Sequence, residues 1–266
     1  MQNSRPNSNQ NKRIALGAPS ILIALVLWQI LSLLGLVNSR IFPSPIQVAS
    51  ALISMLLDGR LITDVAVSLF RALTGFVIGS ITAISFGLMT GRSEKLRQSV
   101  GQIINILRPI PAISIVPLVI VWFGLGEAAK VLTVCWGVFF PVWVSTHVGV
   151  ASVNIEHIWA AQSLGAKRKT ILLEIVLPGA ATSILAGMRT GISIAFICLV
   201  AAEMAGASAG LGFRVTVSHL TFRVDQMIAS IFVLGLLGAI ADKTFVKLSH
   251  KLFPWYARSQ KIYVGD

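Results

Sequence analysis

The sequence alternates long apolar stretches with short polar segments. About 20 apolar residues are enough for a helix to cross the ~30 Å hydrocarbon layer of a bilayer. Six stretches of this kind predict membrane-spanning helices, and they are Ile14–Val37, Ala66–Thr90, Val100–Phe123, Val131–Val153, Ser183–Ala205 and Met227–Phe245. The pattern therefore predicts an all-α polytopic membrane protein.

The third apolar stretch is interrupted by prolines. It contains the segment RPIPAISIVP, with Pro109, Pro111 and Pro117. A proline inside a span frees backbone groups that only neighbouring helices or water can satisfy. We therefore expect a kinked or broken helix here, facing protein rather than lipid.

The polar segment between the fourth and fifth stretches, residues 154–178, has a pattern of its own. Apolar residues recur in it at helical spacing, at Ile155, Ile158, Ala161 and Leu164. Gly165 then permits a sharp turn, because it lacks a Cβ. A second short helix is expected over Lys167–Val176, ended by Pro178. The segment thus predicts two short cytoplasmic helices with a bend between them and a basic tip.

The segment between the first and second stretches predicts an external interfacial helix. Ser44 and Pro45 fit an N-cap residue followed by proline at the first helical position. We expect this helix to run to about Leu57 and to be followed by a turn at Asp58 and Gly59.

Composition agrees with the membrane assignment. The chain is 55% apolar and only 12% charged, with a mean hydropathy of +0.81, whereas soluble domains carry about a quarter charged residues. The net charge of +12 would suit nucleic acid, but the cations cluster at the ends of apolar stretches and are not interleaved with aromatic residues. We therefore expect a lipid bilayer, and no nucleic acid, as the partner of this charge.

The lysines and arginines also orient the chain, because cytoplasmic loops carry an excess of both. With the N-terminus inside, the inner segments hold thirteen of these cations and the outer segments five. Both termini are therefore predicted to be cytoplasmic. The expected organisation is a disordered N-terminus over 1–13, a first span with the interfacial helix over 14–64, a membrane core over 65–250 and a tail over 251–266.

Several segments resemble the permease subunits of ABC importers. The cytoplasmic signature of that family, E-A-A-x-x-x-G-A followed later by L-P, is matched by Ala160, Ala161, Gly165, Ala166, Leu177 and Pro178. The nitrate, sulfonate and taurine branch is resembled by IFPSPIQV (41–48), LRPIPAISIVPLVIVWFGLGEAAK (107–130) and VAAEM (200–204). Trp159 replaces the leading acid of the signature and Thr182 its late proline, so no salt bridge from that acid to a partner is expected.

The resemblance implies a type I ABC importer permease fold in the inner membrane and a transport role without covalent chemistry. The implied partners are a second permease copy, two cytoplasmic ATPase subunits that bind ATP and Mg²⁺, and an extracytoplasmic solute-binding protein. Residues 154–178 would be the coupling element, with Lys167 and Arg168 at its tip. The implied substrate is a small anion such as nitrate, a sulfonate or taurine, with bicarbonate, a pyrimidine precursor or another small solute as alternatives. This chain has no GxxxxGK[ST] motif, so another polypeptide must bind the ATP, and we expect no cofactor here.

Charged residues inside the apolar stretches are candidates for the translocation pathway, because each costs about 2.5–3.5 kcal/mol on insertion scales. Arg108, beside Pro109 and Pro111, and Arg189 are each expected ~10 Å from the inner boundary, where they would present positive charge to an anion. Glu203 lies near the outer end of the fifth stretch. The alternatives are that the arginines snorkel to the interface, that Arg108 holds carbonyls freed by the prolines, and that Glu203 braces the outer gate.

Other chemistry finds little support. Arg71 is expected to be interfacial, and a proton relay at His147 is disfavoured. The four histidines have no metal-ligand spacing with cysteines or acids, and no catalytic residues are expected. An ion-gradient-driven transporter remains the main alternative, although the structured cytoplasmic segment argues against it. A membrane enzyme is disfavoured because the intramembrane arginines offer no acid–base pair.

Overall fold

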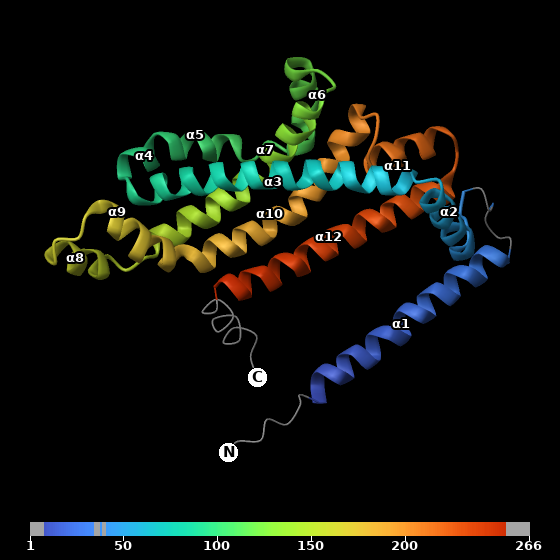
Figure 1. The fold of residues 1–266 in the computed structure, drawn as a ribbon, viewed down its shortest axis with the longest axis horizontal. Helices are drawn as coiled ribbons and strands as arrows, with labels where there is room; N and C mark the ends of the chain where they lie inside the picture. The colour runs from blue at the N-terminus through green and yellow to red at the C-terminus, as the bar shows by residue number, and fades with distance from the viewer. Residues whose placement is uncertain (1–7, 35–37, 39–40, 254–266) are drawn as a thin grey trace. The chain divides into compact units, whose positions relative to one another are not determined.

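The structure is a computed structural model that describes residues 8–34, 38 and 41–253, with the backbone alone for 8–18 and 21. Every regular element in these ranges is a helix (Figure 1). The helices are α1 (Ser8–Leu33), α2 (Pro45–Leu57), α3 (Arg60–Arg92), α4 (Glu94–Gln98), α5 (Val100–Leu107), α6 (Ala112–Phe123), α7 (Glu127–Ala151), α8 (Ile155–Ser163), α9 (Arg168–Thr170), a π-helical turn η1 (Ile171–Val176), α10 (Leu177–Gly206), α11 (Leu211–Leu220) and α12 (Val224–Leu252). The chain divides into unit 1, with Met1–Ile62 and Arg214–Ile231, and unit 2, with Thr63–Phe213 and Phe232–Asp266.

The predicted spans can be compared with these helices. In the described ranges, α3, α7, the run Arg168–Gly206 and α12 are each long and apolar enough to cross a membrane. The pair Glu94–Leu107 and Ala112–Phe123 qualifies when taken together and is bent by 95°, so the expected break in the third span is confirmed. The first predicted span lies partly outside the described residues, and its described part includes the apolar helix Leu22–Leu33.

The predicted ends of the chain are described only in part. Of the N-terminal segment predicted as disordered, residues 1–7 lie outside the described residues, and α1 begins at Ser8. Of the predicted tail, residues 254–266 lie outside them.

Helix α2 follows from its capping residues. The Ser44 hydroxyl accepts a hydrogen bond from the backbone N–H of Gln47 at 3.2 Å, and the Gln47 side chain accepts one from the N–H of Ser44 at 2.8 Å. This reciprocal pair is a capping box, and Pro45 occupies the first turn. The helix ends at Leu57, and Gly59 follows with φ of 72°. The predicted N-cap, helix end and turn are all confirmed.

Unit 2 is built on close contact between α3 and α7. A small residue recurs at every fourth position of α3, at Gly75, Gly79, Ala83, Gly87 and Gly91. A Cβ at Gly75 would lie 2.6 Å from the Cβ of Val134, and one at Gly91 would lie 2.7 Å from the Cβ of Val150. Small residues let membrane helices approach this closely, which increases dispersion contact between them. Because the contacts advance together along both helices, α3 and α7 run parallel.

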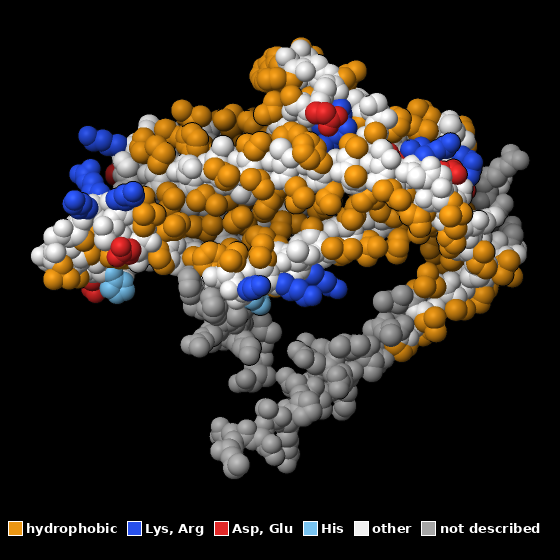
Figure 2. Space-filling model, viewed as in Figure 1, with side chains coloured by type: hydrophobic (Ala, Val, Ile, Leu, Met, Phe, Trp, Pro, Cys, Tyr) orange, Lys and Arg blue, Asp and Glu red, His pale blue; other side chains and the backbone are white. Residues whose placement is uncertain are grey.

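Helix α10 packs against α7 in the opposite direction. Gly137 of α7 faces Cys198, whereas Gly149, one helix length further on, faces Ser183. The predicted topology requires these relative directions. Figure 2 shows hydrophobic side chains along the length of unit 2 and lysines and arginines gathered at the end formed by α4, α8 and α9. This is the end that the cation distribution predicts to be cytoplasmic.

Candidate functional site

Helix α8 carries most of the predicted coupling residues. The Asn154 side chain caps it by accepting a hydrogen bond from the N–H of Glu156 at 2.9 Å. Ile158 is 2% exposed and belongs to an apolar cluster with Ile171 of η1. On the other side, Trp159 and Leu164 are 59% and 88% exposed. Buried aliphatic contacts therefore hold α8 in place, while two large apolar side chains remain available at its surface.

Gly165 makes the turn at the end of α8. Its φ is 80°, a left-handed conformation that costs an L-residue with a Cβ about 1–2 kcal/mol. The N–H of Gly165 donates to the Gln162 carbonyl at 2.9 Å, and the N–H of Ala166 donates to the Ala161 carbonyl at 3.0 Å. These two bonds form a Schellman motif. The predicted turn at Gly165 is confirmed, and Lys167 and Arg168 follow it as exposed residues.

The predicted second short helix is wrong in its extent. Residues Arg168–Gly206 form one continuous helical run of 39 residues, in which the turn η1 joins α9 to α10. In η1 the N–H of Leu177 bonds to the carbonyl of Leu172, five residues back. This wider turn precedes Pro178, which has no N–H of its own, so the helix passes the proline rather than ending at it.

The coupling residues therefore fall into two groups. Around the α8 tip lie Trp159, Ala160, Ala161, Gly165, Ala166, Lys167 and Arg168. Leu177 and Pro178 are at the start of α10 instead, where both line a groove with Leu248 and Leu252 of α12.

A second set of polar residues lies buried at the opposite end of unit 2, where α3 begins and α10 ends. The Arg71 guanidinium binds both oxygens of Glu127, at 2.6 and 2.5 Å, and one oxygen of Glu203 at 2.8 Å. The side chains of Arg71 and Glu203 are 2% and 0% exposed, whereas that of Glu127 is 56% exposed. Ser68 also donates to Glu203 at 2.8 Å. Arg71 thus joins α3, α7 and α10.

These side chains also satisfy the first N–H groups of α11. Asp64 accepts a hydrogen bond from Gly210, the Ser68 hydroxyl from Leu211, and Glu203 from Gly212, at 2.9, 2.9 and 2.8 Å. Acidic groups at a helix N-terminus are favoured by the unpaired N–H groups and by the helix dipole. The polar cluster therefore fixes the connection between α10 and α11.

The expectation that Arg71 is interfacial is wrong. The physical reason is that burial is possible once two carboxylates neutralise and bind the guanidinium. Glu203 braces the outer end of α10, one of the two roles left open for it. A signal was present in the sequence, because Asp64, Ser68 and Arg71 are spaced i, i+4 and i+7 and so share one helix face.

Close approach at the same cluster predicts the effect of Gly212→Ala. A Cβ there would lie 2.8 Å from the Cβ of Glu203 and 2.9 Å from the carbonyl oxygen of Val200. Overpacking of this kind costs about 1–3 kcal/mol, so we expect earlier thermal unfolding of the purified protein. The matched control is Gly235→Ala, where a Cβ would meet nothing within 4 Å. Equal unfolding temperatures for the two variants would contradict the packing argument.

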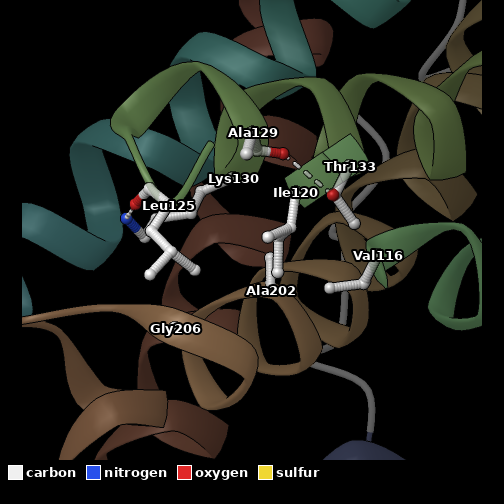
Figure 3. Close-up of a pocket in the computed structure, with 8 residues that line it drawn as sticks. All are labelled: Val116, Ile120, Leu125, Ala129, Lys130, Thr133, Ala202 and Gly206. Carbon is white, nitrogen blue, oxygen red and sulfur yellow. Dashed lines mark hydrogen bonds between the residues drawn. The ribbon is translucent and has the colours of Figure 1, made fainter. Parts of the chain in front are cut away.

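Near the same end, α6, α7 and α10 enclose a small pocket (Figure 3). Lys130, which lines it, donates to the carbonyls of Leu125 and Gly126 at 2.7 and 3.3 Å. The Thr133 hydroxyl donates to the Ala129 carbonyl at 2.9 Å. The polar atoms around this pocket thus serve the first turns of α7 and leave little for a solute.

The structure separates the two predicted pathway arginines. Arg189 forms a two-pronged ion pair with Asp242 of α12, at 2.8 and 3.0 Å, so its charge is neutralised within the chain. The sequence reasoning missed Asp242, which lies 53 positions away. Arg108 lies at the break between α5 and α6 with Pro109 and Pro111, all three exposed. It lines an open pocket with Thr190, the residue after Arg189, so the two arginines share a level but differ in their surroundings.

Comparison with known proteins gives a consistent result. The family described as "Binding-protein-dependent transport system inner membrane component" matches residues 75–252. A putative ABC transporter permease protein of Methanocaldococcus jannaschii is 37% identical over 238 residues, which cover 88% of this chain and 89% of that protein. The taurine transport system permease protein of Escherichia coli is 32% identical over 255 residues, covering 94% and 93%.

A solved structure shares the fold. The MetNI methionine ABC transporter, in inward-facing conformations, matches with a TM-score of 0.63 at 18% identity, covering 73% of this chain and 97% of that chain.

Proposed function

Because the chain belongs to the family of binding-protein-dependent transport system inner membrane components and is a multi-pass permease subunit of an ABC importer, we propose that it carries a small organic sulfonate across the inner membrane. Similarity to a taurine permease over 94% of the chain supports this substrate class. Nitrate, bicarbonate and other small solutes are the competing substrates. As a permease the chain is a transport subunit, and ATP hydrolysis belongs to a separate subunit.

The α8 tip is the surface that we propose couples transport to ATP. It combines a short helix held by Ile158, an exposed apolar pair in Trp159 and Leu164, and exposed cations at Lys167 and Arg168. Such a helix can place its apolar residues in a groove of a partner and transmit a displacement without stretching. The partner is an ATPase subunit that binds ATP and Mg²⁺.

The complete importer is proposed to contain two copies of this chain, two ATPase subunits and one extracytoplasmic binding protein. A homodimer with two-fold symmetry is the commonest arrangement of soluble oligomers, and it would place the two α8 tips symmetrically. Closure of the ATPases would pull both tips together, and the two permeases would rock as rigid bodies, a common form of alternating transition.

Reconstitution tests the proposed function. We expect proteoliposomes with this chain, its ATPase and its binding protein to accumulate radiolabelled taurine only when ATP is present. Nitrate and bicarbonate are measured in parallel. Uptake of nitrate or bicarbonate in place of taurine would contradict the substrate class. Uptake by the chain alone, driven by an ion gradient, would contradict the ATP-coupled mechanism.

A further inference from the structure

We propose that the open pocket around Arg108 is an oxyanion-binding site within the permease, which receives the sulfonate group of the passing solute. The pocket has a volume of about 360 Å³ and lies where the end of α5 meets α7 and α10. Its lining residues are Arg108, Phe140, Pro141, Val144, Ser145 and Thr190. The proposed function enters only through the identity of the anion.

Charge favours Arg108 as the residue that binds the anion. Arg189 offers little net charge, because Asp242 binds it through two hydrogen bonds. Among the described residues, no acceptor lies within hydrogen-bond distance of the Arg108 side chain, and none of the six lining residues is acidic. The pocket therefore carries an uncompensated positive charge.

The depth of the pocket excludes a lipid-facing role. Thr190 lies 16 residues before the end of α10 at Gly206, and Phe140 lies 13 residues after the start of α7 at Glu127. At 1.5 Å per residue these distances are ~24 and ~20 Å, well inside a hydrocarbon layer of ~30 Å. A cation at this level must face protein or a water-filled space rather than lipid. The translocation pathway supplies that space.

Two hydroxyl groups accompany the arginine. Among the described residues, the Ser145 hydroxyl has no hydrogen-bond partner, and Gly187 lets α10 approach it, because a Cβ there would lie 2.7 Å from the Ser145 Oγ. The Thr190 hydroxyl makes one bond of 3.2 Å to the Ala186 carbonyl, and its oxygen retains acceptor and donor freedom on rotation.

These groups match a sulfonate. A guanidinium can bind two oxygens of a planar or tetrahedral oxyanion at once, and the Ser145 hydroxyl can donate to a third. Phe140, Pro141 and Val144 supply an apolar wall for a short alkyl chain, which nitrate lacks. Since no acid lines the pocket, an ammonium group on the solute finds no partner there. The site thus takes short-chain sulfonates with or without an amine, and any discrimination by the amine falls to the binding protein.

Fluorine NMR of trifluoromethanesulfonate tests the site directly. We expect the anion's signal to broaden with the wild-type permease–ATPase complex in nanodiscs. Arg108→Gln should reduce the broadening at least 10-fold, and Ser145→Ala several-fold. The matched control, Arg92→Gln, removes an exposed arginine at the end of α3 and should behave as wild type. Equal broadening in Arg108→Gln, or none in the wild type, would overturn the proposal.

Two further readouts separate this inference from the proposed function. Taurine and ethanesulfonate should displace the probe with similar strength, and a preference above 10-fold for taurine would contradict a site that ignores the amine. Arg108→Gln and Arg108→Ala should each lower taurine uptake at least 10-fold while the ATPase co-purifies at wild-type yield. Probe binding through Arg108 without any sulfonate uptake would refute the proposed substrate but not the site. Uptake unaffected by Arg108→Gln would refute the site but not the substrate.

Discussion

Arg71→Met is expected to destabilise unit 2 by about 3–5 kcal/mol, the cost of removing one partner from a buried ion pair. Glu203 would remain with its side chain 0% exposed, and it would keep its hydrogen bonds from Ser68 and Gly212 but lose the only guanidinium that the described residues bring to it. Glu127 would also be released from α3. The measurement is unfolding of the purified protein in mixed micelles at increasing SDS fraction.

A double variant makes this expectation specific to the pairing of charges. Arg71→Met combined with Glu203→Met removes both buried charges, so no uncompensated carboxylate remains, and we expect it to recover part of the lost stability. Arg97→Met is the matched control, because Arg97 pairs with Glu94 in an exposed pair at 57% and 58% exposure. Exposed pairs contribute little. A loss for Arg71→Met no larger than that for Arg97→Met would show that the buried cluster does not stabilise the unit.

Gly165→Pro is expected to abolish binding of the ATPase while leaving membrane insertion intact. Proline fixes φ near −65°, whereas Gly165 requires 80°, and proline also lacks the N–H that bonds to the Gln162 carbonyl. The end of α8 would open and turn Leu164 and Lys167 away from their positions. The apolar spans are unchanged, so insertion should continue. Co-purification of the ATPase with the permease is the measurement.

Gly165→Ala provides the graded control for this position. It keeps the N–H and adds only a Cβ in the left-handed region, at about 1–2 kcal/mol, so we expect reduced but detectable ATPase binding. Equal amounts of both variants in the membrane fraction establish that insertion is unaffected. Recovery of the ATPase with Gly165→Pro at wild-type yield would refute the role of the α8 tip.

Local signals in the sequence determined a large part of this protein. The apolar stretches define the membrane class, the prolines at 109 and 111 mark the break between α5 and α6, and Ser44 with Gln47 and Pro45 sets the start of α2. Gly165 sets the turn after α8. In each case the groups that interact are within a few residues of one another, so their spacing along the chain is enough to predict the geometry.

The charge pairs were decided only by the tertiary structure. Arg71 meets Glu203 across 132 positions and Arg189 meets Asp242 across 53. Whether two such groups meet depends on the depth and rotation of separate helices after packing, which α3 achieves through its row of small residues. The run through Pro178 likewise depends on the wider turn η1, which is held in an apolar cluster with α8 and α10. A residue's own neighbours in the sequence do not contain that information, because the contacts that neutralise a buried charge or hold a widened turn come from other helices.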